Sequence, residues 1–280
     1  MAACPITAYL VSMASLSLID EAEPPPVEFC HPHGAAPILL TCDHASRAVP
    51  RCLCNLGLDD AVIARHIGWD IGAAAVTRRL APLLDAPAIL GGYSRLVIDC
   101  NRAPEDAGSI PSVSDNTVIP GNASLSDGAR RARREAIFDP YHAAIAARLV
   151  AYQQGGVAPA FISIHSFTPA MNGKARPWHV GVLWDQDGRI ALPLLEGLRA
   201  EPGLVVGDNE PYSAREPVGY TQRHHGHDPG LPHVAIELRQ DLVGDDAGAG
   251  AWAQRLARLL RPILARPELH VAIPPPPPHS

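Results

Sequence analysis

Short apolar runs alternate along the chain with longer segments in which apolar side chains recur at every third or fourth position. Short runs between turn-forming residues are typical of buried strands, and the longer spacing is typical of amphipathic helices. The runs predict strands at the following positions: Ile38–Cys42, Ala88–Leu90, Leu96–Asp99, Phe161–Ile164, His179–Trp184, Leu204–Val206 and Val234–Leu238.

The helical spacing appears in three segments and is expected in a fourth. It covers residues 59–84, with an interruption around Gly68, and returns at 190–200 and 251–264. A further long helix is expected from Ser124 towards Tyr152, because Ser124 followed by Asp127 resembles a capping box. The arginine-rich run Arg130–Arg134 is expected to form a solvated face of that helix.

Strands that alternate with helices favour an α/β fold. We therefore expect a three-layer αβα sandwich built around a mixed, largely parallel sheet. In folds of this kind the functional groups gather at the carboxyl ends of the strands. The sequence thus predicts that catalytic side chains follow or end the predicted strands.

The composition is that of a single globular domain with additions at both ends. The chain has 280 residues, 47% of them hydrophobic, which is enough for one sizeable core. We divide it into an N-terminal extension (1–30), a central domain (31–268) and a proline-rich tail (269–280). The run Pro274–Pro278 in this tail is expected to be extended and solvated.

Charge and hydropathy exclude several classes of protein. The formal net charge is −6 and no long basic run occurs, so we expect no binding to nucleic acid. No apolar stretch reaches the roughly 18 residues that a membrane span needs. The segment Tyr9–Ile19 is broken by serines and lacks a preceding basic region, which disfavours a secretory signal.

All six cysteines fall at or before Cys100, which is not the pattern of a small disulfide scaffold, so we expect reduced thiols in a cytoplasmic protein.

Polar residues with metal-binding or catalytic chemistry stand at the predicted strand ends. His44 follows the first strand, His165 ends a later one, and Glu237 lies near the end of the last. Together with Asp70, in the turn-rich segment Gly68–Gly72, the two histidines would make the two-His, one-carboxylate shell that is usual for a catalytic zinc. Their spacing is not a local zinc signature such as H-E-x-x-H. It therefore leaves open the alternative that both histidines are core residues hydrogen-bonded at strand ends.

A long polar segment follows one of these strand ends. Residues 102–123 are rich in Pro, Ser, Asp, Asn and Gly. A loop of this length inside a compact domain is usually functional. We expect it to form a lid or a pocket wall, with Asn101 and Arg102 at its base.

Five blocks, taken in order, resemble a known family of enzymes. They are Cys42–Ser46, Gly68–Ala73, Ser94–Arg102, Ser163–Ser166 and Ile236–Leu242. Their combination resembles the N-formylglutamate amidohydrolases over roughly residues 35 to 265, although each block alone is weak. That family is similar in architecture to zinc carboxypeptidases, aspartoacylases and cell-wall amidases. The resemblance thus implies a zinc-exopeptidase-like fold and one Zn²⁺ ion per chain.

Carried over residue by residue, the resemblance implies a metal site and a base. His44, Asp70 and His165 match the zinc ligands, and Glu237 matches the late catalytic glutamate. Asp70 is proposed because Arg47 occupies the position where carboxypeptidases carry a glutamate three residues after the first histidine.

The block Asp99–Arg102 resembles the Asp-x-Asn-Arg block of aspartoacylases, and the resemblance implies roles in substrate binding. Asn101 and Arg102 would hold a substrate carboxylate, and the upstream Arg95 would polarise the scissile carbonyl. Arginine suits both tasks because it is always charged and grips carboxylates with two prongs.

Two further residues are weaker candidates for contact with the substrate. Arg239 either reaches the site or pairs with Asp241. His225 either lines the pocket or belongs, like His224 and His227, to a solvated turn.

Three functional hypotheses follow. The first is a cytoplasmic zinc amidohydrolase of amino-acid catabolism that acts on a small acidic N-acyl amino acid, with N-formylglutamate as the type substrate. The second is a related metallo-amidase with another N-acyl substrate. The third is a non-catalytic metal- or ligand-binding relative, which is disfavoured because every expected metal and base position carries a competent residue. The sequence leaves the oligomeric state open.

Overall fold

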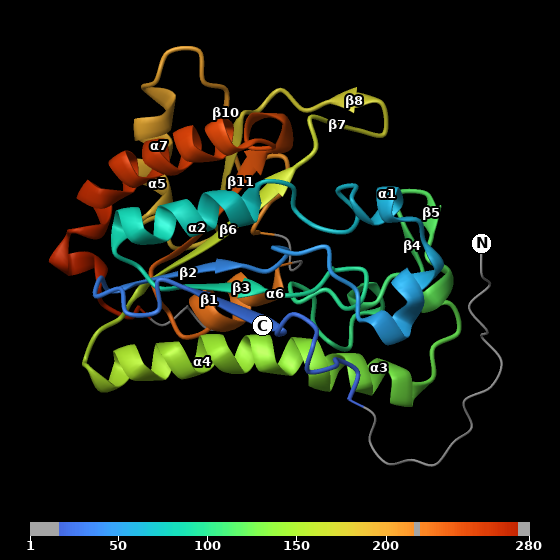
Figure 1. The fold of residues 1–280 in the computed structure, drawn as a ribbon. Coiled ribbons are helices and arrows are strands. Elements are labelled where there is room, and N and C mark those ends of the chain that lie inside the picture. Colours follow the sequence, from blue (N-terminus) through green and yellow to red (C-terminus); the bar gives the residue numbers. More distant parts are fainter. Residues whose placement is uncertain (1–16, 216–218, 274–280) are drawn as a thin grey trace, which may run out of the picture.

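A seven-stranded sheet forms the middle layer of the computed structural model, which describes residues 17–215 and 219–273 (Figure 1). The strands lie in the order β1-β3-β2-β6-β11-β9-β10. Their bounds are β1 Val27–Cys30, β2 Ile38–Cys42, β3 Ala88–Gly91, β6 Ala160–Phe167, β9 Val180–Leu183, β10 Val206–Asp208 and β11 His233–Arg239. Strands β3, β2, β6 and β11 are parallel neighbours, while β1 and β9 run antiparallel to β3 and β11. The predicted α/β fold with a mixed, largely parallel sheet is confirmed.

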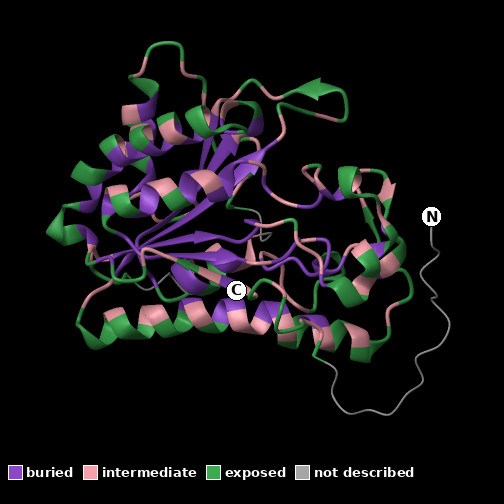
Figure 2. Ribbon diagram, in the orientation of Figure 1, coloured by how far each residue is buried: buried purple, intermediate pink, exposed green. Residues whose placement is uncertain are grey.

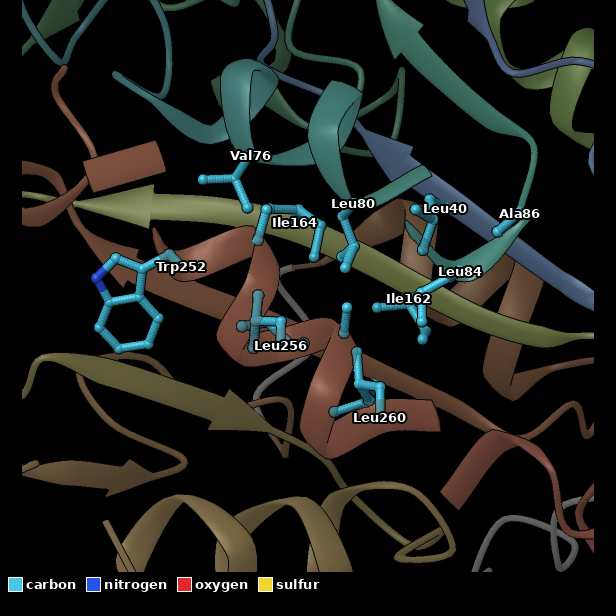
Figure 3. Close-up of a cluster of buried hydrophobic side chains, with 14 of the residues drawn as sticks. Leu40, Val76, Leu80, Leu84, Ala86, Ile162, Ile164, Trp252, Leu256 and Leu260 are labelled. Atoms are coloured by element: carbon cyan, nitrogen blue, oxygen red, sulfur yellow. The ribbon is translucent and has the colours of Figure 1, made fainter. Parts of the chain in front are cut away.

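Helices α2 (Ala73–Leu84), α5 (Ala191–Arg199) and α7 (Asp246–Leu264) cover one face of the sheet (Figure 1). Alternate strand residues point to this face, because successive side chains of a strand lie on opposite sides. Ile162 and Ile164 of β6 meet Leu80 of α2 and Leu256 of α7 in a fully buried cluster (Figure 3). This continuous apolar layer is the larger of the two cores. Figure 2 shows that the central strands are almost entirely buried.

The opposite face packs on one long helical rod. Helix α3 (Asp127–Arg133) continues through the π-turn η4 (Arg134–Phe138) into α4 (Asp139–Gln154). Leu39 of β2 and Phe161 of β6 point to this side and are buried against Tyr141 and Ile145 of α4. Helix α4 therefore covers the part of the sheet formed by β1, β3, β2 and β6.

Short elements occupy the connections, and several of them lie beyond the carboxyl ends of the parallel strands (Figure 1). They are η1 Arg51–Gly57, α1 Asp60–Ile63, η2 Ala107–Ser109, β4 Val113–Ser114, β5 Thr117–Val118, η3 Pro120–Asn122, β7 Ala170–Met171, β8 Lys174–Ala175, α6 Tyr220–Gln222, η5 Arg223–His227, η6 Gln240–Leu242 and η7 Pro267–Leu269. The predicted interruption around Gly68 is confirmed, because residues 64–72 separate α1 from α2.

The prediction of a strand at Leu96–Asp99 is wrong. Leu96, Val97 and Ile98 are buried, but the backbone turns here. The carbonyls of Leu96 and Val97 accept hydrogen bonds from the side chains of Asn122 and Arg133 instead of from a neighbouring strand. An apolar run indicates that a segment is buried, but not that it is a strand. Here the hydrogen bonds that a neighbouring strand would make come from side chains distant in the sequence.

The arginine run and its cap also differ from expectation. Ser126, not Ser124, caps α3, and its hydroxyl accepts the backbone N–H of Ala129. Arg133 is 1% exposed and donates to the carbonyls of Val97 and Gly121 and to the side-chain oxygen of Asn122. Burial lowers the pKa of Arg133 to about 10. The predicted solvated face is therefore wrong for Arg133, whose guanidinium ties the 94–102 segment to α3.

The ends of the described chain pack on the domain. Strand β1 lies inside the range 1–30, and η7 and His270 still make hydrogen bonds near residue 270. The predicted strand Leu204–Val206 lies two residues further on, as β10. Residues 1–16 and the polyproline run lie outside the described residues, so the division at residues 30 and 268 stays a prediction. No helix of the described ranges is long and apolar enough to cross a membrane.

Candidate metal centre

Three side chains from three distant segments meet beyond the carboxyl end of the sheet. His44 follows β2, His165 lies in β6, and Asp70 lies in the turn that leads into α2. One potential ligand atom of each lies within 4.8 Å of the others. The backbone N–H of Asp70 donates to the carbonyl of His44 over 3.0 Å, which fixes the turn against the strand end. The sequence thus predicted a group that the fold brings together.

Glycine allows this turn to approach the neighbouring chain. Gly72 precedes α2 with φ +84°, a conformation that favours glycine. A Cβ atom at Gly72 would lie 2.2 Å from the carbonyl oxygen of Val243. The turn that carries Asp70 therefore needs glycine at this position.

Both histidines turn the same ring nitrogen towards Asp70. Nδ1 of His165 lies 3.0 Å and Nδ1 of His44 3.4 Å from Oδ2 of Asp70. Their other nitrogens point to two further carboxylates. Nε2 of His44 donates to Oδ1 of Asp99 over 2.7 Å, and Nε2 of His165 lies 3.1 Å from Oδ2 of Asp43.

The two carboxylates behind the histidines, Asp43 and Asp99, are buried and held in the ionised form. Burial opposes ionisation of Asp43, but the hydrogen bond and charge of His165 and the charge of His44 outweigh it and lower the pKa of Asp43 to about 2. Its other oxygen accepts the hydroxyls of Tyr141 at 2.8 Å and Thr221 at 2.7 Å. The Asp99 carboxyl is buried too, and Arg95 and His44 hold its pKa well below the usual range.

The donor set, two histidines and one carboxylate, could hold a metal ion. A carboxylate on the far nitrogen of a metal-binding histidine fixes the tautomer, so that the near nitrogen presents its lone pair. Nδ1 of His44 is buried and makes no hydrogen bond to a described residue, although Oδ2 of Asp70 lies 3.4 Å away. A buried polar atom without a partner costs about 1–3 kcal/mol. A cation between His44, Asp70 and His165 would supply the missing partner.

Glu237 stands beside this group on the neighbouring strand. It pairs in register with His165, because β11 runs parallel to β6. Burial raises the pKa of Glu237 to about 7, and its Oε2 has no hydrogen-bond partner in the described part of the chain. A carboxyl group with a pKa near 7 can both accept and donate a proton at neutral pH.

The group opens into a cavity of about 1100 Å³. Arg95, Asn101, Arg102 and Glu237 all line it, as do residues of the 102–123 segment. Arg95 donates to Oδ2 of Asp99 through Nε and Nη2, and its Nη1 lies 3.6 Å from Asp70. Within residues 17–215 and 219–273 the side chain of Arg102 makes no ion pair or hydrogen bond, so its charge is available to a ligand in the cavity.

Two predicted substrate residues lie away from this cavity. Arg239 donates through Nε and Nη2 to Asp241, which is the structural alternative expected for it. His225 is 4% exposed and shares a 2.9 Å hydrogen bond with His142. Neither belongs to the described residues that line the cavity.

Sequence patterns missed several residues that the fold adds to the site. Tyr141 and Thr221 orient Asp43 from 98 and 178 positions away, and no local signal links them. Tyr212 and Gln222 also line the cavity. Asp43 and Asp99 had a visible signal, since Asp43 adjoins His44 and Asp99 begins the block Asp99–Arg102.

The fold and the site define a class: an α/β protein with a candidate single-metal centre at the carboxyl edge of its sheet. The model of the N-formylglutamate amidohydrolase family matches residues 36–244. The chain belongs to the N-formylglutamate amidohydrolase family.

The solved structures that are similar to this chain include the following two. A gene product of Agrobacterium tumefaciens shares 35% identity and a TM-score of 0.85, over 89% of this chain and 98% of its own. The N-formylglutamate amidohydrolase of Ralstonia eutropha JMP134 shares 20% identity and a TM-score of 0.50, over 85% of this chain and 97% of its own. The second likeness concerns the fold alone. No curated protein matches the chain.

Proposed function

We propose that the protein is a zinc-dependent amidohydrolase that cleaves an N-formyl or N-acyl amide on an acidic amino acid. The type reaction is N-formylglutamate plus water to formate plus glutamate. The supporting observation is the group His44–Asp70–His165, with a carboxylate behind each histidine and Glu237 beside it.

His44 and His165 would hold the ion through Nδ1, and Asp70 through a carboxylate oxygen. Bound zinc would supply Lewis acidity, which activates water towards an amide carbonyl. Asp99 and Asp43 keep the two rings oriented by accepting from, or lying against, their Nε2 atoms. The chain thus presents two lone pairs and one negative charge to the ion.

Glu237 would move the proton. As a carboxylate it takes a proton from the attacking water and then gives it to the nitrogen of the leaving amine. The oxygen of water forms a new C–O bond to the acyl carbon, and the C–N bond then breaks, which releases the free acid and the amine. Its pKa of about 7 suits both transfers at neutral pH.

Arg95 would polarise the scissile carbonyl, and Arg102 would bind the substrate carboxylate. Arg95 is fixed by Asp99 and lies near Asp70, so it can present charge to the scissile carbonyl without moving. Arg102 lines the same cavity and can take the carboxylate of the amino acid together with the side-chain amide of Asn101. The oxygen of that amide accepts the backbone N–H of Thr221, which orients its NH₂ group.

The test is a turnover assay on purified, zinc-loaded protein with two substrates: N-formylglutamate and its analogue without carboxylates. A charged hydrogen bond is worth about 1.5–3 kcal/mol. Arg102→Ala should therefore lower kcat/KM on N-formylglutamate by roughly 10- to 150-fold and have little effect on the analogue. Equal losses on both substrates would refute the anchoring role. Absence of any amide hydrolysis by the wild type would refute the function.

A further inference from the structure

The cavity also borders β11, and we call this part of it the trough. Glu237, Ala235 and His233 all line it and point to the same face of the strand. Four residues of strand span about 13 Å. The residues of β11 that line the trough therefore span about 13 Å, from Glu237 to His233 at the beginning of the strand.

Two walls enclose the trough. One is α6 with η5, which begins where the N–H of Tyr220 donates to the carbonyl of Asn101. It ends against His233, so close that a Cβ on Gly226 would lie 2.8 Å from the Cβ of His233. The other wall is the end of β9, where Leu183 pairs in register with Ala235. The wall formed by α6 and η5 thus leads from Asn101, part of the proposed carboxylate anchor, past the metal centre to His233.

This space exceeds what a formyl group needs. A formyl group has only a hydrogen beyond its carbonyl carbon, so it would leave the trough empty. The small side chain of Ala235 keeps the floor open between Glu237 and His233. A larger acyl group fits the trough while the amino-acid part stays at Asn101 and Arg102.

The far part of the trough also carries an unpaired amide. Both Nε2 and Oε1 of Gln222 are buried and have no hydrogen-bond partner among the described residues. Oε1 packs beneath Gly226, 3.1 Å from the position of a Cβ there. Gln222 lines the cavity, and its terminal torsion is broad, so either amide atom can be presented to a group bound against it. A group with one donor and one acceptor, such as a peptide unit, would satisfy both atoms.

We infer that the acyl group of the natural substrate is peptide-like, carries an amide, and lies along β11 with Gln222 as the residue that selects it. This rests on the proposed function and specifies its substrate. Hydrolysis then adds the hydroxyl of water to the acyl carbon and a proton to the amine, and it releases a peptide-like acid and the acidic amino acid.

Three substrates separate size from amide recognition: N-formyl-, N-pentanoyl- and N-(acetylglycyl)-glutamate. Pentanoyl and acetylglycyl groups have nearly the same length, and only the second carries an amide. The assay measures release of free glutamate by the zinc-loaded protein. We expect kcat/KM for the acetylglycyl substrate to exceed that for each of the others by about tenfold or more.

Gln222→Met removes the amide at nearly constant size. It should bring the acetylglycyl-to-pentanoyl ratio close to one. The matched control Gln154→Met, at an exposed position on α4, should keep the wild-type ratio. Ala235→Leu should lower both longer substrates relative to the formyl one. Zinc content and thermal unfolding report whether each variant is folded.

The outcomes separate this inference from the function on which it rests. If formylglutamate is the best substrate, or if pentanoyl and acetylglycyl substrates are equal in the wild type, the inference is overturned and the proposed function stands. An unchanged ratio in Gln222→Met overturns the role of Gln222. If none of the three substrates is hydrolysed, the proposed function fails and the inference fails with it.

Discussion

Two pairs of buried histidines lie within this domain, and they differ in what faces their ring nitrogens. The rings of His44 and His165 are 5.3 Å apart at 61°, and those of His142 and His225 are 5.1 Å apart at 15°. All four side chains are at most 7% exposed. Similar burial and similar spacing therefore do not distinguish the pairs.

The difference is the presence of carboxylates. Burial lowers the pKa of His165, but Asp43 and Asp70 outweigh it and raise that pKa well above the usual value. Within the described residues no carboxylate contacts the second pair: Nε2 of His142 donates to the carbonyl of Cys100, and its Nδ1 accepts from His225. Burial lowers the pKa of His142 to about 4 and, with repulsion from His142, that of His225 to about 3. The carboxylates around the first pair thus stabilise positive charge there, whereas the second pair packs as neutral rings.

The largest expected effect concerns the carboxylate beside the first pair. Glu237→Gln keeps the shape of the side chain but removes its ability to take a proton. General acid–base catalysis typically contributes 10²–10⁴-fold, so kcat should fall by about that factor. Zinc content should stay at the wild-type level, because no proposed ligand is lost. A fall of less than about tenfold would place the base elsewhere, and loss of zinc would make Glu237 a ligand.

A smaller effect is expected when the carboxylates behind the histidines are neutralised. Loss of such a partner typically costs 10- to 100-fold in metal affinity. Asp99→Asn and Asp43→Asn should each weaken zinc binding by that factor in a competition titration with a chelator. Asp241→Asn, whose carboxylate pairs with Arg239 outside the cavity, is the matched control. Unchanged zinc affinity in both Asp99→Asn and Asp43→Asn would show that these carboxylates do not set the first histidine pair apart from the second.

The smallest effect concerns the neutral pair and the pH dependence of stability. The pKa of His225 is about 3 in the folded chain and near 6.5 in the unfolded chain. Between these two pH values the unfolded state therefore binds more protons than the folded state. Stability should therefore decline as the pH falls from 7 to 5, by roughly 2 kcal/mol for this one group. His225→Leu should reduce that decline by about the same amount in urea unfolding, whereas His33→Leu, at an exposed position, should not. An unaltered decline would show that His225 does not enter the folded state neutral.

The sequence predicted the layers well because burial and periodicity determine them. The strands β2, β6 and β11 appear as apolar runs, and helix α7 appears as an apolar stripe. The failure at Leu96–Asp99 has a physical cause. A buried apolar run can satisfy its carbonyls with Asn122 and Arg133, and nothing near the run announces those partners.

The candidate site could be predicted only in part. Resemblance to the family selected His44, Asp70 and His165, and the fold brings them together. Contacts that cross the chain could not be derived from spacing. Examples are the hydroxyl of Thr221 on Asp43 and the stacking of His225 on His142, both of which arise from the return of α6 and η5 over β6 and β11. Arg239 illustrates the converse, because its pairing with Asp241 is local and was already one of the two alternatives.

The most direct test of this account is the zinc content of three purified proteins, measured by elemental analysis after dialysis. They are the wild type, His165→Ala from the carboxylate-bound pair, and His225→Gln from the neutral pair. We expect about one zinc per chain in the wild type and in His225→Gln, and almost none in His165→Ala. Retention of zinc by His165→Ala, or its loss from His225→Gln while that variant remains folded, would contradict the assignment of the metal site.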